Sequence, residues 1–352
     1  MQRLAKLSTG VIAGVLALLS IAPPPARSAD TTVRVGILNI TSDAPLLVAD
    51  REGFFKQEGL DVVFTTFASA GNMIVPLGSN QLDVGGGAPA VGIYNGVEHG
   101  INVRIVADKG SDTMGYGFDK LMVRKELITS GRYRSPKDLR GLTIAGNQPG
   151  SVSASALYEL LKKYGLKFTD VKRVNLDYPS HAAALANGKV DASITAEPEA
   201  TQAERIGAAV KVMGDDHWYP NQQLSCLIYS NDFMKNRTDV AHKFMRAYLK
   251  GLRFYYDSLK DGHYAGKNGE SVITLLTQAT TLKDRTIYRE LTPAGVNPDG
   301  RLNLDSMRKD LQFFRDQGLI EGKVRVEDVI DESFLNSAIA ELGTYKNPKR
   351  AK

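Results

Sequence analysis

The sequence is poor in the residues that build disulfides, metal centres and nucleophilic active sites. Its 352 residues include one cysteine, Cys226, so an intramolecular disulfide and a multi-cysteine metal site are both excluded. The five histidines show no metal-ligand spacing of the His-Glu-x-x-His type, and no Gly-x-Ser-x-Gly nucleophile elbow occurs. We therefore expect no catalytic residue, no metal and no cofactor.

A concentrated basic surface is missing as well. The formal net charge is only +5, and the one basic cluster, at residues 132–140, falls in a turn-rich segment that we interpret as solvated surface. Nucleic-acid binding requires a dense patch of Lys and Arg. We therefore expect no nucleic-acid partner.

Long apolar runs are confined to the N-terminus. Residues 11–22 carry no charge, follow a basic start and are ended by three prolines at 23–25. The run is shorter than the ~20 residues of a spanning helix. It lacks the polar face of a buried amphipathic helix, the alternative interpretation, and is typical of a secretory signal peptide. We expect residues 1–29 to be removed by cleavage near Ser28 or Ala29, which lowers the formal charge to about +2. No cysteine lies directly after the cleavage site, where a lipid anchor would be attached. We therefore predict a free periplasmic protein without a lipid anchor.

From residue 33 onward, apolar strands alternate with helical segments over a length sufficient for two cores. This alternation is typical of parallel sheets wound with helices. We predict an α/β fold of two lobes, each a doubly wound, mostly parallel sheet, with a hinge between them. The predicted strands are 33–40, 60–67, 82–84, 103–107, 121–123, 142–145, 171–176, 192–195, 210–213 and 224–229.

Several short motifs occur in a fixed order behind the leader. They are ADREGFFKQEGLDV at 49–62, LDVG at 82–85, LRGLTIA at 139–145, NGKVDA at 187–192 and the pair Glu197-Pro198. In this order they resemble the nitrate, sulfonate and taurine class of ABC-importer binding proteins, which also includes receptors for thiamine-pyrimidine precursors. Many relatives carry an aromatic residue just before the Glu-Pro pair, whereas this chain has Ala196.

The resemblance implies the type II periplasmic-binding-protein fold, in which both ends of the chain build the first lobe. It also implies two hinge crossings, near residues 116–121 and 220–229. The expected division is a signal peptide at 1–29, a first lobe at 30–118 and 229–345, a second lobe at 119–228 and a tail at 346–352.

Candidate ligand contacts follow from the position of strand ends. In open α/β sheets a ligand binds beyond the carboxyl ends of the strands, where helix N-termini offer free N–H groups and partial positive charge. The glycines and small side chains at these points let a ligand approach the backbone. The predicted ligand-binding residues are Thr41, Ser42, Asp43, Gly87, Ala88, Gln148, Gly150, Ser151, Ser153 and Glu197.

Each candidate group also has a purely structural interpretation. Ser42 or Asp43 can serve only as a helix N-cap. The glycines at 85–87 can serve only as a tight turn, and Glu197 can be a surface acid paired with a nearby Lys or Arg.

We expect the protein to capture a small organic anion or zwitterion, such as a sulfonate, a taurine-like molecule, a carboxylate or a nitrogen heterocycle. The resemblance implies delivery to a permease and an ATPase at the inner membrane, and we expect a monomer. Two alternatives stay open at this point. One is an enzyme like the thiamine-pyrimidine synthases, which share the fold but use a cysteine cluster. The other is a ligand sensor for a membrane receptor.

Overall fold

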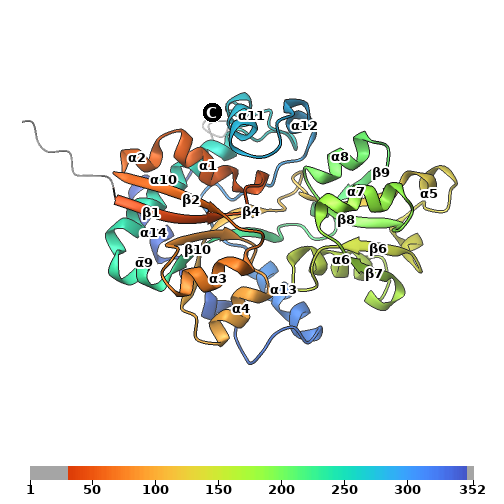
Figure 1. Ribbon diagram of the computed structural model, residues 1–352, viewed down its shortest axis with the longest axis horizontal. Helices are drawn as coiled ribbons and strands as arrows, with labels where there is room; N and C mark the ends of the chain where they lie inside the picture. Colours follow the sequence, from red (N-terminus) through yellow and green to blue (C-terminus); the bar gives the residue numbers. More distant parts are fainter. Residues whose placement is uncertain (1–30, 347–352) are drawn as a thin grey trace, which may run out of the picture.

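A computed structural model describes residues 31–346 of the chain. The expected signal peptide at 1–29 and all but the first residue of the expected tail lie outside this range. No helix within the described range is long and apolar enough to cross a membrane. The described residues form two five-stranded sheets with helices on both faces, and the two lobes lie side by side along the long axis of the molecule (Figure 1). The predicted two-lobed α/β fold is confirmed.

The first lobe contains a sheet of strand order β2-β1-β3-β10-β4. Strand β1 pairs in parallel with β2 and β3, whereas β10 is antiparallel to both β3 and β4. The strands are β1 (Thr31–Ile37), β2 (Leu60–Thr66), β3 (Val84–Gly87), β4 (Val103–Ser111) and β10 (Gln223–Ser230). The helices are α1 (Ala44–Arg51), α2 (Phe54–Gln57), α3 (Gly71–Gly78), α4 (Val91–Glu98), α9 (Asn231–Asn236), α10 (Thr238–Tyr256), α11 (Gly269–Ala279), α12 (Arg285–Glu290), α13 (Leu304–Asp316) and α14 (Ser333–Leu342).

The second lobe repeats this plan with strand order β7-β6-β8-β5-β9. Strand β6 is parallel to β7 and β8, and β5 is antiparallel to β8 and β9. The strands are β5 (Asp119–Arg124), β6 (Thr143–Gly146), β7 (Lys172–Asn175), β8 (Ala192–Ala196) and β9 (Ala209–Gly214). The helices are α5 (Lys125–Thr129), α6 (Val152–Lys163), α7 (Tyr178–Ala186) and α8 (Glu199–Arg205).

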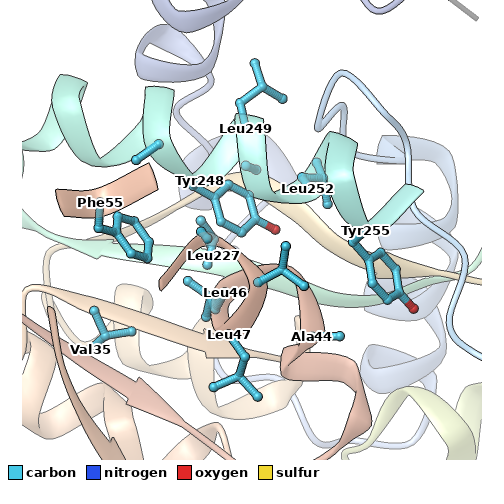
Figure 2. Packing of buried hydrophobic residues seen from close by; sticks show 14 of the residues in the cluster. Val35, Ala44, Leu46, Leu47, Phe55, Leu227, Tyr248, Leu249, Leu252 and Tyr255 are labelled. Atoms are coloured by element: carbon cyan, nitrogen blue, oxygen red, sulfur yellow. The ribbon is translucent and has the colours of Figure 1, made fainter. Parts of the chain in front are cut away.

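Helix α10 covers the first sheet because its apolar residues recur at helical spacing. Phe244, Tyr248, Leu252 and Tyr255 lie on one face and are buried. Figure 2 shows the last three of these packed with Leu46 of α1. Each such side chain contributes about 1.5–3 kcal/mol by leaving water. The two tyrosine hydroxyls donate to backbone carbonyls, one of them to Ala294 at 2.7 Å, so the helix also fixes the chain beside the hinge.

Two segments connect the lobes, residues 112–118 between β4 and β5 and residues 215–222 between β9 and β10. The expected division placed residues 223–228 in the second lobe, but β10 begins at Gln223 and pairs with β3 and β4 of the first sheet. The crossings therefore lie several residues earlier than expected. The physical reason is the pairing of β10, which begins one residue before the predicted strand, at Gln223, and bonds throughout within the first lobe.

Candidate functional site

The two lobes touch where strand ends of one lobe face helix starts of the other. The backbone N–H of Val91, at the start of α4, donates to the carbonyl of Gly150 at 3.2 Å. A Cβ added at Gly150 would come within 2.9 Å of the Val91 side chain. Only glycine permits this approach, so the two lobes are in contact at Gly150.

A small apolar cluster lies between the lobes at the same level, and most of it was not predicted. Phe118 and Leu224 come from the crossings and their edges, and Tyr178 begins α7 after strand β7. The other members are Ala88, Val152, Ala196 and Ala294. The strand-end rule applied to β7 identifies Tyr178, which is absent from the predicted ligand-binding residues.

Thr41, Ser42 and Asp43 form a single 3₁₀ turn between β1 and α1, and all three are buried. One oxygen of Asp43 accepts the N–H groups of Leu38 (3.0 Å) and Ile40 (3.2 Å). Its other oxygen accepts from Nζ of the fully buried Lys109 at 2.7 Å. Both carboxylate oxygens of Asp43 therefore hold the turn in place.

Thr41 differs from Asp43 in this respect. Its side chain is 3% exposed, and its hydroxyl has no hydrogen-bond partner within residues 31–346. A buried hydroxyl without a partner costs about 1–3 kcal/mol. Thr41 is therefore the group of this turn that is free to bond a solute.

Gly87 ends β3 and Ala88 follows it toward the interlobe cluster. A Cβ at Gly87 would lie 2.3 Å from the Cβ of Ala70, so packing against the start of α3 accounts for this glycine. Beneath it the thiol of Cys226 donates to the Gly87 carbonyl at 3.2 Å. Burial raises the pKa of Cys226, and the side chain has no exposed area, so it is not an accessible nucleophile.

The turn from Gln148 to Ser153 begins α6. Gln148 is exposed, whereas Ser151 is the N-cap, its Oγ accepting from the N–H of Ala154 at 3.3 Å. Ser153 is buried, and its Oγ lies 3.1 Å from that of Ser151. Ser153 also hydrogen-bonds the hydroxyl of Tyr178, whose pKa burial raises. Ser151, Ser153 and Tyr178 thus form a polar chain at the edge of the interlobe cluster.

Glu197 lies at the end of β8 and is buried, but its carboxylate faces its own lobe. One oxygen accepts the N–H of Thr201 at 3.0 Å, and the other lies 3.7 Å from Nζ of Lys211 without a hydrogen bond. This geometry is that of an acid paired with a lysine, the structural alternative recognised for this residue. The structure does not bring Glu197 together with Thr41 or Ser151.

Four buried carboxyl groups lie in or next to the crossings, on Asp112, Asp119, Asp215 and Asp216. Burial raises the pKa of Asp119 to about 7, with Lys120 acting in the opposite direction, and no described residue donates a hydrogen bond to it. Burial also raises the pKa of Asp112 and of Asp215, and nearby carboxylates act in the same direction on both. Carboxyl groups that lie close together oppose each other's ionisation.

No group of three or more His, Cys, Asp or Glu side chains within residues 31–346 is arranged to hold a metal ion. An open groove of about 700 Å³ lies outside the crossings, lined by parts of both and by residues 296–308. Its arginines are already paired, Arg308 with Asp305 and Glu327. None of the predicted ligand-binding residues lines this groove, so the interlobe contact is the better candidate site.

Comparison with known proteins agrees with this description. The sequence matches the model of the family described as NMT1/THI5 like over residues 40–258. It is 24% identical to the taurine-binding periplasmic protein of Escherichia coli over 63% of this chain and 67% of that protein. The fold is similar to that of the alkanesulfonate-binding protein SsuA from Xanthomonas axonopodis bound to MOPS, with a TM-score of 0.65 at 17% identity, covering 86% and 98% of the two chains. It is also similar to the desulfurization enzyme DSZB, with a TM-score of 0.61 at 16% identity, covering 89% and 99%.

Proposed function

Because this chain belongs to the NMT1/THI5-like family, we propose that it is the solute-binding component of an ABC importer. It captures a small organic anion or zwitterion between its lobes and delivers it to a permease at the inner membrane. The taurine-binding and alkanesulfonate-binding relatives support this class of solute. The leader at residues 1–29 and the periplasmic relative support a periplasmic location.

The observation that carries the proposal is the interlobe site itself. Strand ends, helix starts and an apolar cluster from both lobes converge there. The start of α6 offers partial positive charge to an anionic group. The Thr41 hydroxyl offers a further hydrogen bond.

A donor group on the solute fits the other side of this site. Asp119 is the first residue of β5, next to Phe118 of the interlobe cluster, and its buried carboxyl lacks a described donor. An ammonium or ring N–H of the solute supplies such a donor. This favours a zwitterion, such as an aminosulfonate, over a simple anion.

Two alternatives are less well supported. A cysteine-dependent enzyme requires an exposed thiolate, and the only cysteine is buried under Gly87. A sensor differs from a transport receptor only in its membrane partner, and genes for a permease and an ATPase beside this one favour transport.

The test is a thermal-shift panel on the mature protein with taurine, hexanesulfonate, MOPS, benzoate and a pyrimidine. A solute at a hundred times its dissociation constant adds about 2.7 kcal/mol to the free energy of unfolding. We expect such a shift with at least one sulfonate or zwitterion. Stabilisation only by sugars, metal ions or polyamines contradicts the proposed solute class.

A matched pair of variants locates the site in the same assay. Ser151→Ala and Ser230→Ala each remove an N-cap hydroxyl, the first from α6 and the second from α9 on the first lobe, and each costs about 1 kcal/mol of stability. Only Ser151→Ala is expected to weaken binding of the stabilising solute, about tenfold. Equal affinity in the two variants places the solute elsewhere.

A further inference from the structure

Arg205, the last residue of α8 in the second lobe, reaches across to the first lobe. Its guanidinium donates to both oxygens of Glu290, at 2.8 and 3.1 Å, and to Asp284 at 2.9 Å. A fourth bond joins it to the hydroxyl of Thr286 at 2.6 Å. All three partners lie on or next to α12. The planar guanidinium thus uses its fork geometry on two acids at once.

Both ends of this contact are fixed in hydrophobic cores. Helix α8 is held by Ala200 and Ala203, which belong to a core cluster of the second lobe. Helix α12 is held by Ile287 and Tyr288, which belong to the main core of the first lobe. A change in the distance between the lobes on this side therefore has to stretch or break the Arg205 contacts.

No other ion pair within residues 31–346 joins the second sheet and its helices to the first lobe; the remaining pairs lie within one lobe or next to a crossing. The other hydrogen bonds between the lobes are neutral backbone bonds, such as that of Val91 with Gly150, or involve the buried Asp310. The Arg205 cluster is therefore distinct in being charged and exposed to salt.

The cluster is also connected to both walls of the candidate site. Helix α8 begins three residues after Ala196, and the chain after α12 leads directly to Ala294; both alanines belong to the interlobe cluster. We propose that Arg205, Asp284 and Glu290 form an interlobe latch that favours the closed arrangement of the lobes and slows release of the solute. The effect on solute release rests on the proposed function, whereas the effect on the open and closed arrangement of the lobes does not.

The latch is expected to change the equilibrium between open and closed lobes more than the free energy of unfolding. Exposed ion pairs contribute little to the stability of a fold, but a two-state equilibrium between open and closed lobes responds to a few-fold change in either state. Hydrogen bonds from Thr286, together with Arg205, lower the pKa of Asp284 to about 2, so this acid remains ionised across the physiological range. The latch is therefore expected to depend on salt.

The experiment measures the distance between the lobes in protein without added solute. Dyes are attached at Ala183→Cys on α7, which packs against α8, and Ser271→Cys on α11, which packs against α12; both positions are exposed. Cys226 is buried and does not compete for label. Single-molecule energy transfer then gives the ratio of closed to open molecules.

The test variant is Arg205→Gln, and its matched control is Arg289→Gln. Arg289 lies on the same helix α12 and makes an exposed two-pronged contact with Glu270 of α11, at 3.0 Å for both bonds, inside one lobe. We expect Arg205→Gln to lower the closed-to-open ratio three- to tenfold and to remove its salt dependence. Arg289→Gln should leave the ratio unchanged, and both variants should melt within a degree or two of each other.

An Arg205→Gln protein with the parental distance distribution and salt dependence overturns the latch, as does an equal shift in Arg289→Gln. The Glu290→Gln variant and the Arg205→Gln/Glu290→Gln double variant close a mutant cycle, in which additive effects also contradict it. Because no solute is added, these outcomes do not depend on whether the thermal-shift panel identifies a ligand.

Discussion

At the scale of single residues, the candidate site separates side chains that hold the fold from those that remain free. Asp43 accepts from two backbone N–H groups and from Lys109. Glu197 accepts from the N–H of Thr201 and pairs with Lys211 at 3.7 Å, and its second oxygen has no hydrogen bond. Thr41, in the same turn as Asp43, keeps an unpaired buried hydroxyl. This free hydroxyl beyond the end of β1 is the reason for proposing Thr41 as a contact for the solute.

Thr41→Val tests this distinction because it removes the hydroxyl and keeps the shape. Loss of an unpartnered buried hydroxyl should leave the free energy of unfolding unchanged or raise it by up to about 1 kcal/mol. Affinity for the solute identified by thermal shift should fall about tenfold, the loss of one hydrogen bond. Calorimetric titration and chemical denaturation measure the two quantities.

Thr280→Val serves as the control for that variant. The Thr280 hydroxyl is bonded to the carbonyl of Leu276 and to Tyr288, far from the interlobe cluster, so its loss should destabilise the protein without changing affinity. A Thr41→Val protein that binds normally but unfolds more easily shows a structural role for Thr41 and removes it from the site.

The sequence predicts these side chains only in part. Strand-end position identifies Thr41 and Ser151, because the rule depends on topology that the apolar pattern reveals. The rule does not reveal that Asp43 pairs with Lys109, because this buried contact joins residues 66 positions apart. Tyr178 and Leu224 reach the cluster through the packing of one lobe on the other, which no local pattern contains.

At the scale of elements, helix α13 joins the first lobe to the second. Its Phe313 packs with Tyr158 of α6 and with Phe168. Its fully buried Asp310 accepts hydrogen bonds from Ser155 at 2.6 Å and from Tyr219 at 2.8 Å. Burial raises the pKa of Asp310 to about 7 in spite of these donors.

This raised pKa gives the stability a defined dependence on pH. Between about pH 4 and pH 7 the folded protein keeps a proton on Asp310 that the unfolded chain releases, so stability falls as pH rises, by up to about 1.4 kcal/mol per pH unit for one group. Asp108, whose pKa burial raises to about 6, and Asp119 act in the same direction. His181, whose pKa burial lowers, opposes them weakly near pH 6.

We therefore expect a higher melting temperature at pH 5 than at pH 7.5, and a shallower slope in Asp310→Asn. Differential scanning calorimetry across this range measures both. A melting temperature that rises steadily from pH 5 to pH 7.5, or an Asp310→Asn slope equal to that of the parent protein, contradicts this assignment.

The elements themselves are the most predictable part of the fold. Each of the ten apolar segments expected to be strands overlaps a strand of the structure. The antiparallel direction of β5 and β10 was missed, because an apolar run buried on both faces looks the same in either direction. Strand β4 continues beyond the predicted residue 107 to Ser111, since Ser111 pairs with Gln223 and Gly295.

At the scale of the whole molecule, two similar sheets are connected by two short crossings and touch at few points away from them. Such an arrangement permits hinge motion with little internal rearrangement of either lobe. The Val91–Gly150 bond and the Arg205 cluster describe lobes in contact. The proposed capture of a solute requires the lobes to alternate between this state and a more open one.

Small-angle X-ray scattering of the mature protein, with and without the panel solute that gives the largest thermal shift, tests the central claim most directly. If the protein captures a solute by closing its lobes, the radius of gyration falls at saturating solute and the scattering fits the closed two-lobed structure. An unchanged radius of gyration at full occupancy, with scattering that fits the same shape before and after addition, contradicts capture by lobe closure.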